Sequence, residues 1–408
     1  MNLPETDSED ELPEVWEPKI SQDNYVFYVN HQEKITQWTH PKTGKLKRVS
    51  SDLPNGWKKR LDESTGIEIF INHENGKETY IDPRLAFATE EASAAVGQIR
   101  QRFDASSRAL QVLHGKDLSG KLCIITGANC GIGFETAKSL AFHECHVIFA
   151  CRNKESAENA IQAIEKERPS AVGKCRFMHV DLASLRSVVT FIESVKKEVK
   201  HIDFLILNAG VFGLPYTVTE DGLEATFQIS HLSHFYVTIN LVPLLDHTSR
   251  VIVVSSESHR FANFPECGGL TEEIISPPPS KYWSMMAYNN AKLCNVLFAK
   301  ELAKRLQHKG ISVFSLHPGN LVSSNLSRNW WLIRVLFAFV RPFTKSLQQA
   351  AATTVYCATA EEITGLTGLY FNNCFVCEPS ILAHSDELSQ SLWDISEKLI
   401  NEKLQAHT

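Results

Sequence analysis

The chain has 408 residues and 43% of them are hydrophobic, so it can form one large domain with a substantial core and smaller modules beside it. Its formal net charge is −6, which argues against a general nucleic-acid binder, because such a protein presents a strongly basic face. Residues 1–15 hold six acids and no Lys or Arg. We therefore expect an acidic tail over residues 1–9 rather than a basic secretory or mitochondrial leader.

A repeat with a period of 41 residues, from Trp16 to Trp57, occupies the first part of the chain. The first copy reads LPEVWEP…FYVNH…TQWTHP and the second reads LPNGWKK…IFINH…ETYIDP. Each copy predicts three short strands separated by turns, and aromatic and proline side chains must hold so small a sheet together. We place the copies at residues 10–43 and 51–84, with a basic linker at 44–50.

The two copies resemble WW domains in their spaced aromatics, their Asn-His pair and their closing Pro. Alternation along a strand directs Phe27, Val29 and His31 to one face of the first copy, and the resemblance adds Trp38 to that face. Two facing aromatic rings form a groove for a polyproline II ligand, and a neighbouring His suits the Tyr of a Pro-Pro-x-Tyr motif. The first copy is therefore expected to bind Pro-Pro-x-Tyr proteins, although Phe27 replaces the Tyr usual in the family and lacks its hydroxyl.

The second copy differs from the first at the groove, because Ile69 and Tyr80 occupy the two groove positions. Without a facing pair of rings, we expect it to bind proline poorly and to serve as a structural partner of the first copy. The run PKTGKLKR between the copies is typical of either a nuclear-import signal or a solvated linker, and both interpretations stay open. Residues 85–117 are rich in Ala, Ser and Gln and predict a connector with one helix.

A strand, a glycine turn and a helix are predicted from KLCIIT at 121–126 and TGANCGIGFE at 126–135. Glycines let backbone amides approach a pyrophosphate at the helix N-terminus, where the helix dipole favours negative charge. Further strands follow at βαβ intervals, which predicts an α/β fold with a Rossmann-type doubly wound parallel sheet over residues 118–378. A C-terminal helical extension is expected at 379–408. The residues expected around the pyrophosphate are Gly127, Ala128, Asn129, Cys130, Gly131, Ile132 and Gly133.

The type of dinucleotide is indicated by the end of the second predicted strand, which reads ACRN. An acidic residue there would accept hydrogen bonds from the ribose hydroxyls of NAD, but this chain has Arg152. A guanidinium suits a 2′-phosphate, so NADP(H) is the expected cofactor. The alternative is that Arg152 is an ordinary solvated charge at a strand end.

A candidate catalytic set follows in YNNAK, which places Tyr288 and Lys292 four residues apart on one helix face. Phenol titrates near pH 10, so a Tyr that exchanges protons near neutrality needs a nearby cation to stabilise its phenolate, and Lys292 can supply it. A hydroxyl from VSSES, preferably Ser256, would hydrogen-bond the substrate oxygen. Tyr-x-x-x-Lys alone is a weak signal, but its combination with the glycine turn, NAG and HPG in this order is specific.

Residues 119–375 resemble a short-chain dehydrogenase/reductase, and most of all the retinol-dehydrogenase-like branch of that family. The resemblance covers the glycine turn, NAG, the Tyr-Lys pair and HPG, and it implies further cofactor contacts. Those contacts are Asp181 near the adenine, Asn208 supporting the central strand, Lys292 on the nicotinamide ribose, and Pro318 and Gly319 beside the nicotinamide.

One motif departs from the family pattern, because SHLSHF stands where the family has an NHLGHF-like helix. Ser230 replaces an Asn that anchors a water in the proton relay from Lys, and Ser233 replaces a Gly. Since Ser is shorter than Asn, the efficiency of the relay is in question unless a second water bridges the gap.

The remaining features concern a membrane span, a substrate lid and a metal site. The run WWLIRVLFAFV at 330–340 contains Arg334 and is far shorter than the roughly 20 apolar residues that span a bilayer, so no transmembrane helix is predicted. The segment 320–345 is interpreted either as a substrate lid for an apolar ligand or as an amphipathic helix covering the domain, a membrane or a partner. Cys374 and Cys377 have C-x-x-C spacing without a second such pair, so no metal site is expected.

These patterns together predict an NADP(H)-dependent oxidoreductase of an apolar carbonyl or alcohol, retinoid- or steroid-like, combined with an adaptor for Pro-Pro-x-Tyr proteins. The alternative is a redox-sensitive scaffold that binds cofactor but turns over little. Proteins that join WW domains to such an oxidoreductase imply a role in tumour suppression, apoptosis and signalling. They also imply a cytoplasmic location with nuclear and mitochondrial pools.

Overall fold

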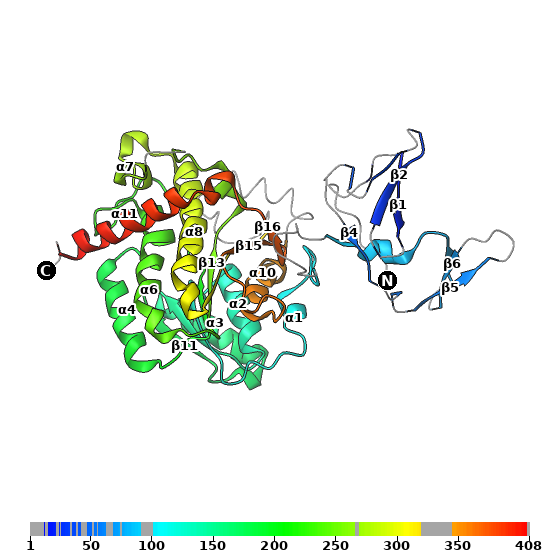
Figure 1. The fold of residues 1–408 in the computed structure, drawn as a ribbon. Helices are drawn as coiled ribbons and strands as arrows, with labels where there is room; N and C mark the ends of the chain where they lie inside the picture. Colours follow the sequence, from blue (N-terminus) through cyan, green and yellow to red (C-terminus); the bar gives the residue numbers. More distant parts are fainter. Residues whose placement is uncertain are drawn as a thin grey trace. The chain divides into compact units, whose positions relative to one another are not determined.

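The protein divides into two units, Met1–Arg102 and Phe103–Thr408, which Figure 1 colours along the chain. This computed structural model describes residues 101–102 at the end of the first unit, and the second unit over residues 103–265, 269–319 and 345–405. No helix among the described residues is long and apolar enough to cross a membrane. The other described residues of the first unit are 12, 15–21, 24, 26–32, 35–37, 40–41, 47–50, 53–54, 56–62, 68–73 and 76–90.

Each N-terminal copy forms a three-stranded antiparallel sheet, as the repeat predicted. In the first sheet Glu17 pairs with Val29 and Pro18 pairs with Tyr28, so alternate residues face opposite sides. One side is the packed side, where Tyr28 is only 2% exposed, and the other side is open. The strands are β1 Trp16–Ile20, β2 Val26–Asn30 and β3 Ile35–Gln37, then β5 Trp57–Leu61, β6 Glu68–Asn72 and β7 Glu78–Thr79.

The core of the first copy is completed by residues from both sides of the second copy. Val49, which precedes the second copy, is buried with Val26 and Tyr28, and Leu85 and Ala88, which follow it, pack against the same cluster. A two-stranded antiparallel sheet fastens these two segments together, so the expected basic linker is partly a strand. Its strands are β4 Lys47–Arg48 and β8 Thr89–Glu90.

Arg84 adds a polar connection between the same segments. Its Nη1 donates to Asn24 Oδ1 at 3.2 Å and to the Ser50 carbonyl at 3.3 Å, while Nη2 pairs with Asp82 Oδ2 at 2.7 Å. The pKa of Arg84 is raised, chiefly by its hydrogen bond to Asp82. The first copy is therefore a discontinuous module into which the second copy is inserted.

An eight-stranded sheet forms the centre of the second unit, in the order β11-β10-β9-β12-β13-β14-β15-β16. Only β16 runs antiparallel to its neighbour, which confirms the predicted doubly wound parallel sheet. The strands are β9 Leu122–Thr126, β10 His146–Cys151, β11 Cys175–His179, β12 Phe204–Leu207, β13 Arg250–Val254, β14 Ser312–His317, β15 Leu369–Asn372 and β16 Phe375–Cys377.

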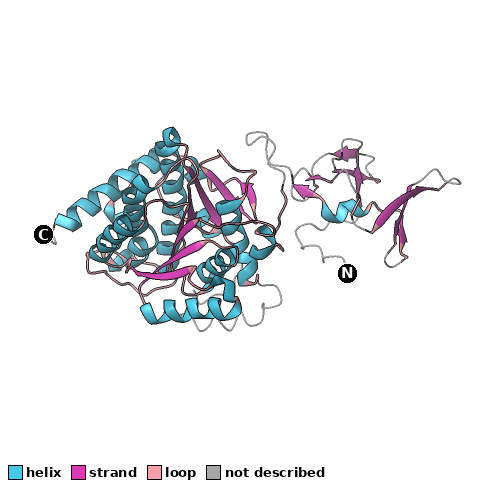
Figure 2. Cartoon of the chain, turned by 90° about the horizontal axis from the view of Figure 1, so that it is seen from below, coloured by secondary structure: helices cyan, strands magenta, loops and turns pink. Residues whose placement is uncertain are grey.

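Helices cover both faces of this sheet (Figure 2). On one face α4, α6, α8 and the C-terminal α11 share a large apolar core with the strands, and on the other α2 packs against α10. The helices are α1 Ala109–Val112, α2 Gly131–Ala141, α3 Lys154–Glu167, α4 Leu185–Glu198, α5 Ala225–Phe227, α6 Ser233–Leu241, α7 Glu272–Ile275, α8 Ser284–Leu306, α10 Leu347–Thr359 and α11 Asp386–Gln405. Short 3₁₀ turns are η1 Pro83–Phe87, η3 Pro169–Ala171, η5 Val242–Leu244, η6 Glu257–Phe261, η7 Pro279–Lys281, η8 Gln307–Lys309 and η11 Ile381–His384.

The strand order reverses direction between β9 and β12, which are neighbours in space but not in sequence. Local capping sets where the flanking helices begin, since Asn153 Oδ1 accepts from Ser156 N at 2.8 Å and Ser184 Oγ accepts from Ser187 N at 3.2 Å. In open α/β sheets a ligand binds outside the carboxyl ends of the strands at such a reversal. The fold therefore directs attention to the loops that follow β9, β12, β13 and β14.

Candidate active site

The glycine turn after β9 uses its glycines in two ways. Gly127 and Gly131 have φ of 67° and 62°, a conformation that favours glycine. Gly133 is required by packing, because a Cβ there would lie 2.5 Å from both Asn208 Nδ2 and the Gly127 carbonyl oxygen. The turn therefore brings the start of α2 against the end of β12 and leaves backbone amides at the helix N-terminus, where an anion is stabilised.

Thr126 connects the two strands at the reversal. Its Oγ1 accepts from Asn208 N at 2.9 Å and from Ala209 N at 3.0 Å, and Asn208 Nδ2 donates to the Thr126 carbonyl at 2.9 Å. With both lone pairs used, the hydroxyl proton is directed to His234 Nε2, 2.9 Å away. Burial lowers the pKa of His234 to about 4, so this ring is a neutral structural link.

A cavity of about 490 Å³ opens at this edge of the sheet, within the size range of ligand pockets. Ala128 is fully buried beneath the turn, whereas Ser256 and Gly319 are not among the residues that line the cavity. The expected site residues that do line it are Gly127, Asn129, Cys130, Gly131, Ile132, Gly133, Arg152, Asp181, Asn208, Tyr288, Lys292 and Pro318.

One end of the cavity carries Arg152 and Asp181. The Arg152 side chain is 66% exposed and its Nη1 lies 4.0 Å from Asp181 Oδ2, so the guanidinium is loosely held. Two hydrogen bonds position Asp181: its N donates to Ser187 Oγ at 2.9 Å, and its Oδ1 accepts from Ala183 N at 3.0 Å. An exposed guanidinium and a hydrogen-bonded carboxylate therefore lie side by side in the cavity lining.

Tyr288 lies toward the other end, on α8. Its ring packs edge-on against Phe212 with the centroids 4.9 Å apart. Burial raises the pKa of Tyr288 to about 12, and a hydrogen bond with Ser256 partly offsets that rise. Burial alone therefore shifts the phenol away from neutrality, so proton transfer near pH 7 depends on a cation.

Lys292, the candidate for such a cation, lies one turn further along α8. Its Nζ lies 5.6 Å from the centroid of the Tyr288 ring and donates to the Val254 carbonyl at 3.1 Å. The side chain passes close to Gly210, where a Cβ would lie 3.3 Å from Nζ. Burial lowers the pKa of Lys292 to about 8, so the amine is still mainly protonated at neutral pH.

Ser256 is positioned by the loop that follows β13. Its carbonyl accepts from His259 Nδ1 at 2.7 Å, and His259 Nε2 accepts from Ser380 N at 2.9 Å. The next residue, Glu257, accepts from Tyr370 Oη at 2.8 Å. Residues near the C-terminus therefore hold the serine loop against the end of β13.

The departure at Ser230 has a structural counterpart. Residues Gln228–Leu232 form a π-turn between α5 and α6, a feature common at functional sites. Ser230 Oγ is buried without a hydrogen-bond partner among the described residues, and a side-chain hydrogen bond between His231 and Asn295 acts to raise the pKa of His231 against the larger, opposite effect of burial. Asn295 Nδ2 donates to the same Val254 carbonyl as Lys292, at 3.1 Å, so these polar atoms lie behind the lysine.

Some lining residues were not anticipated from the sequence. Phe212, Leu214 and Ile229 line the cavity, and Ser156 supports its rim by accepting from Asn129 Nδ2 at 2.9 Å. Phe212 lies two residues after NAG, beyond the carboxyl end of β12, and this position is the available signal for it. Ser156 gives no such signal because only the packing of α3 brings it to the glycine turn.

The first repeat presents Phe27 and Val29 half-buried and His31 exposed on the open side of its sheet. Trp38 and residues 320–344 of the predicted lid lie outside the described residues.

Cys374 is buried in the turn between β15 and β16, and burial raises the pKa of its thiol to about 12. Within the described part of the chain, no group of three or more His, Cys, Asp and Glu side chains is arranged to hold a metal ion.

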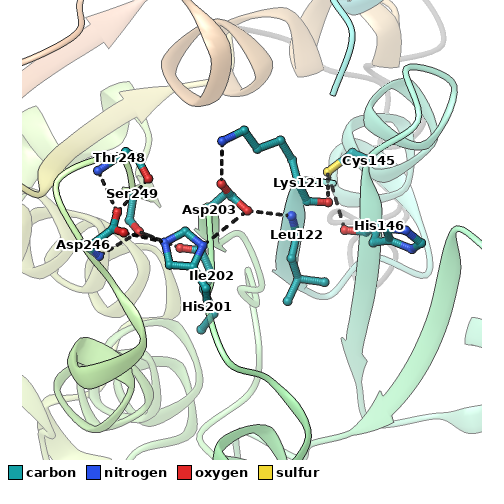
Figure 3. Close-up of polar contacts among 10 residues, drawn as sticks. All are labelled: Lys121, Leu122, Cys145, His146, His201, Ile202, Asp203, Asp246, Thr248 and Ser249. Atoms are coloured by element: carbon teal, nitrogen blue, oxygen red, sulfur yellow. Dashed lines mark hydrogen bonds and ion pairs between the residues drawn. The ribbon is translucent and has the colours of Figure 1, made fainter. Parts of the chain in front are cut away.

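A second polar cluster occupies the amino end of the sheet (Figure 3). Asp203 accepts from Lys121 Nζ and from Leu122 N, each at 2.9 Å, and His201 Nδ1 lies 3.6 Å from it. Ser249 Oγ is 3.3 Å from His201 Nε2, which resembles a Ser-His-Asp order. Ser249 is fully buried, however, and its hydroxyl donates to the Ile202 carbonyl at 2.6 Å, so this cluster is structural.

The glycine turn, the cavity at the strand reversal and the Tyr288–Lys292 pair define a dinucleotide-dependent oxidoreductase domain. A family model described as short chain dehydrogenase matches residues 121–266, and a WW domain model matches residues 12–41. The chain is 64% identical to the WW domain-containing oxidoreductase of Drosophila melanogaster, over 98% of each chain. It therefore belongs to the WW domain-containing oxidoreductases, a family of short-chain dehydrogenases that carry WW domains.

Two further similarities cover the second unit. Retinol dehydrogenase 12 of Mus musculus is 38% identical over 69% of this chain and 87% of that protein. The crystal structure of an uncharacterized protein from Mycobacterium Paratuberculosis superposes with a TM-score of 0.57 at 28% identity, covering 71% of this chain and 97% of that one. Both similarities agree with the oxidoreductase fold.

Proposed function

We propose that the chain is an NADP(H)-dependent oxidoreductase of an apolar carbonyl or alcohol, retinoid- or steroid-like, that also holds Pro-Pro-x-Tyr proteins at its first repeat. The observation that carries the proposal is one cavity whose lining includes Arg152 as well as Tyr288 and Lys292. Phe212, which packs against Tyr288, and Leu214 line the same cavity, which favours an apolar substrate.

The residues present fit a dinucleotide. The amides at the start of α2 would hold the pyrophosphate, Asp181 and Arg152 would lie at the adenosine end, and Lys292 would reach the nicotinamide ribose. When bound, NADP(H) would supply or accept a hydride. Ser256 would orient the substrate oxygen, and Tyr288 would give it a proton in reduction or remove one in oxidation, with the Lys292 ammonium stabilising the phenolate.

Cofactor preference tests the role of Arg152. The wild-type chain should bind NADPH more tightly than NADH by roughly 10- to 100-fold, as expected for a charge-assisted contact with the 2′-phosphate. Arg152→Ala should remove most of that difference, whereas Arg176→Ala, which changes an exposed arginine paired with Glu198, should preserve it. Calorimetric titration with both cofactors measures the ratio. Equal affinity of the wild type for both would contradict the assignment.

A second candidate function is a redox-sensitive scaffold that binds cofactor and turns over little. The observation that favours it is the unpartnered Ser230 Oγ where the family has an Asn. Retinoid and steroid panels with both cofactors distinguish the two functions, and Ser230→Asn should raise the rate if the relay is limiting. Absence of turnover by both forms, with cofactor still bound, would favour the scaffold.

The proposal extends to the cell, where its support is the family resemblance. We place the protein mainly in the cytoplasm with nuclear and mitochondrial pools, and in signalling linked to apoptosis and tumour suppression. Fractionation of cells that produce the tagged full chain tests the locations, and a strictly cytoplasmic signal would restrict the proposal.

A further inference from the structure

The open side of the first repeat carries a carboxylate, Glu17, directly opposite Val29 in the strand register. Glu17 Oε2 accepts a hydrogen bond from His31 Nε2 at 2.7 Å and lies 3.5 Å from Lys19 Nζ. The Glu17 and His31 side chains are 51% and 62% exposed, so a ligand lying across Val29 meets both of them. An exposed pair of this kind adds little stability, which leaves recognition as its main effect.

The contact decides which nitrogen of His31 carries the proton. The hydrogen bond with His31 is the largest cause that lowers the pKa of Glu17, so this carboxylate is ionised at neutral pH. An ionised carboxylate only accepts hydrogen bonds, so His31 Nε2 must be the protonated nitrogen. In the neutral ring Nδ1 is then a bare acceptor, suited to a hydroxyl that donates to it.

The second repeat lacks this arrangement. Its strand register places Lys58 opposite Ile71, the position that corresponds to Glu17 opposite Val29. His73 is present at the position of His31, but an ammonium only donates hydrogen bonds and cannot accept one from a ring nitrogen. The two copies therefore share the histidine and differ in the group that orients it.

We propose that Glu17 is a specificity-determining residue of the first repeat. It holds His31 as the Nε2-protonated tautomer, so that Nδ1 accepts a hydrogen bond from the hydroxyl of an unmodified tyrosine. A phosphorylated tyrosine has lost that hydroxyl and brings two negative charges toward the Glu17 carboxylate, which repels it. This inference rests on the proposed binding of Pro-Pro-x-Tyr ligands.

The test is calorimetric titration of the full chain with short synthetic peptides that carry one Pro-Pro-Pro-Tyr motif, its Phe analogue or its phosphotyrosine form. For the wild type we expect the Phe peptide to bind roughly 3- to 10-fold more weakly than the Tyr peptide, the range for one neutral hydrogen bond. The phosphopeptide should bind more weakly still. Glu17→Ala removes the acceptor, so it should reduce the Tyr-to-Phe ratio to below about 2-fold and improve phosphopeptide binding. Lys19→Ala, a matched change on the same strand face, should leave the Tyr-to-Phe ratio unchanged.

The outcomes separate this inference from the groove itself. A Glu17→Ala chain that bound the Tyr peptide and kept the wild-type ratios would overturn the role of Glu17 while the groove stood. A wild-type chain that bound neither the Tyr nor the Phe peptide would overturn the groove and the role of Glu17 together. If Lys19→Ala lowered the Tyr-to-Phe and Tyr-to-phosphotyrosine affinity ratios as much as the Glu17 change does, general surface charge would explain the effect and the specific role of Glu17 would be overturned.

Discussion

At the amino end of the parallel sheet both carboxylate oxygens of Asp203 accept hydrogen bonds, from Lys121 and Leu122, and His201 links Asp203 to Asp246 (Figure 3). At the carboxyl end, the buried hydroxyl of Ser230 has no hydrogen-bond partner among the described residues. Buried polar groups are normally hydrogen-bonded, and each exception calls for an explanation. The comparison teaches that the same side-chain chemistry stabilises the sheet where it is satisfied and remains available to a ligand, water or proton where it is not.

Removing the phenol at the carboxyl end should give the largest effect. Tyr288→Phe keeps the ring packed against Phe212 but removes the proton donor, so turnover should drop by roughly 10²- to 10⁴-fold, with cofactor affinity and thermal stability nearly unchanged. Steady-state rates on a responsive retinoid or steroid measure the drop. Tyr282→Phe is the matched control, since Tyr282 is not among the residues that line the cavity and its hydroxyl donates to the Leu214 carbonyl at 2.8 Å. Comparable losses from both changes would contradict the assignment of Tyr288.

Removing the Asp203 carboxylate at the amino end should lower stability and leave cofactor binding unchanged. Asp203→Ala leaves the Leu122 amide and the Lys121 ammonium without their acceptor, which should cost about 1–3 kcal/mol of the free energy of unfolding. Cofactor affinity should stay as in the wild type. Urea unfolding measures the loss, and Asp117→Ala, which removes an exposed carboxylate bonded to Ser119, is the control with little expected change. If Asp203→Ala abolished cofactor binding but left the free energy of unfolding unchanged, the structural role of Asp203 would be contradicted.

The buried lysine should give the carboxyl end a pH dependence of its own. Because burial lowers the pKa of Lys292 to about 8, the ammonium that stabilises the phenolate is lost as pH rises through about 8. The rate of carbonyl reduction should therefore decline by roughly tenfold per pH unit above that value. Lys292→Arg keeps its charge, so any remaining activity should lack this decline. A wild-type profile that is flat from pH 7 to 10 would contradict the role of Lys292.

The smallest effect is expected from acid at the amino end. Hydrogen bonds from Thr248 lower the pKa of Asp246 from 3.8 to about 2, so the ionised form is favoured in the folded protein. A depressed carboxyl pKa stabilises the fold above the unfolded value, and this contribution is lost as pH falls from about 4 to about 2. Asp246→Asn should make the decline of the melting temperature over this interval slightly shallower. An identical slope in both proteins would show that Asp246 makes no such contribution.

The features that the sequence predicted correctly depend on local pattern. A doubly wound sheet follows from apolar runs at βαβ intervals, and the glycine turn and the Tyr288–Lys292 spacing each lie within one turn or one helix. The parallel sheet could therefore be predicted without information on distant contacts, and the observed strand order confirms it. The roles given to Arg152 and the groove residues remain predictions.

The features that the sequence did not indicate depend on distant segments that meet. Asn295 lies beside Lys292 because both side chains donate to the Val254 carbonyl. Gly210, in the loop after β12, has no side chain and so leaves room for the Lys292 ammonium. The strand pairing of 47–48 with 89–90 is likewise invisible in two-residue segments, which carry no periodicity.

The insertion of the second repeat into the first also sets an order in time. Val26, Tyr28 and Val49 leave the ribosome before their packing partners Leu85 and Ala88, which come about 40 residues after Val49. At translation rates of about 5–20 residues per second, the first repeat waits roughly 2–8 seconds for the segment that closes its core. During that interval the aromatic side chains of an N-terminal sheet stay accessible to chaperones and proteases, so a slower or paused ribosome between the two repeats lengthens the exposure of the module that emerges first.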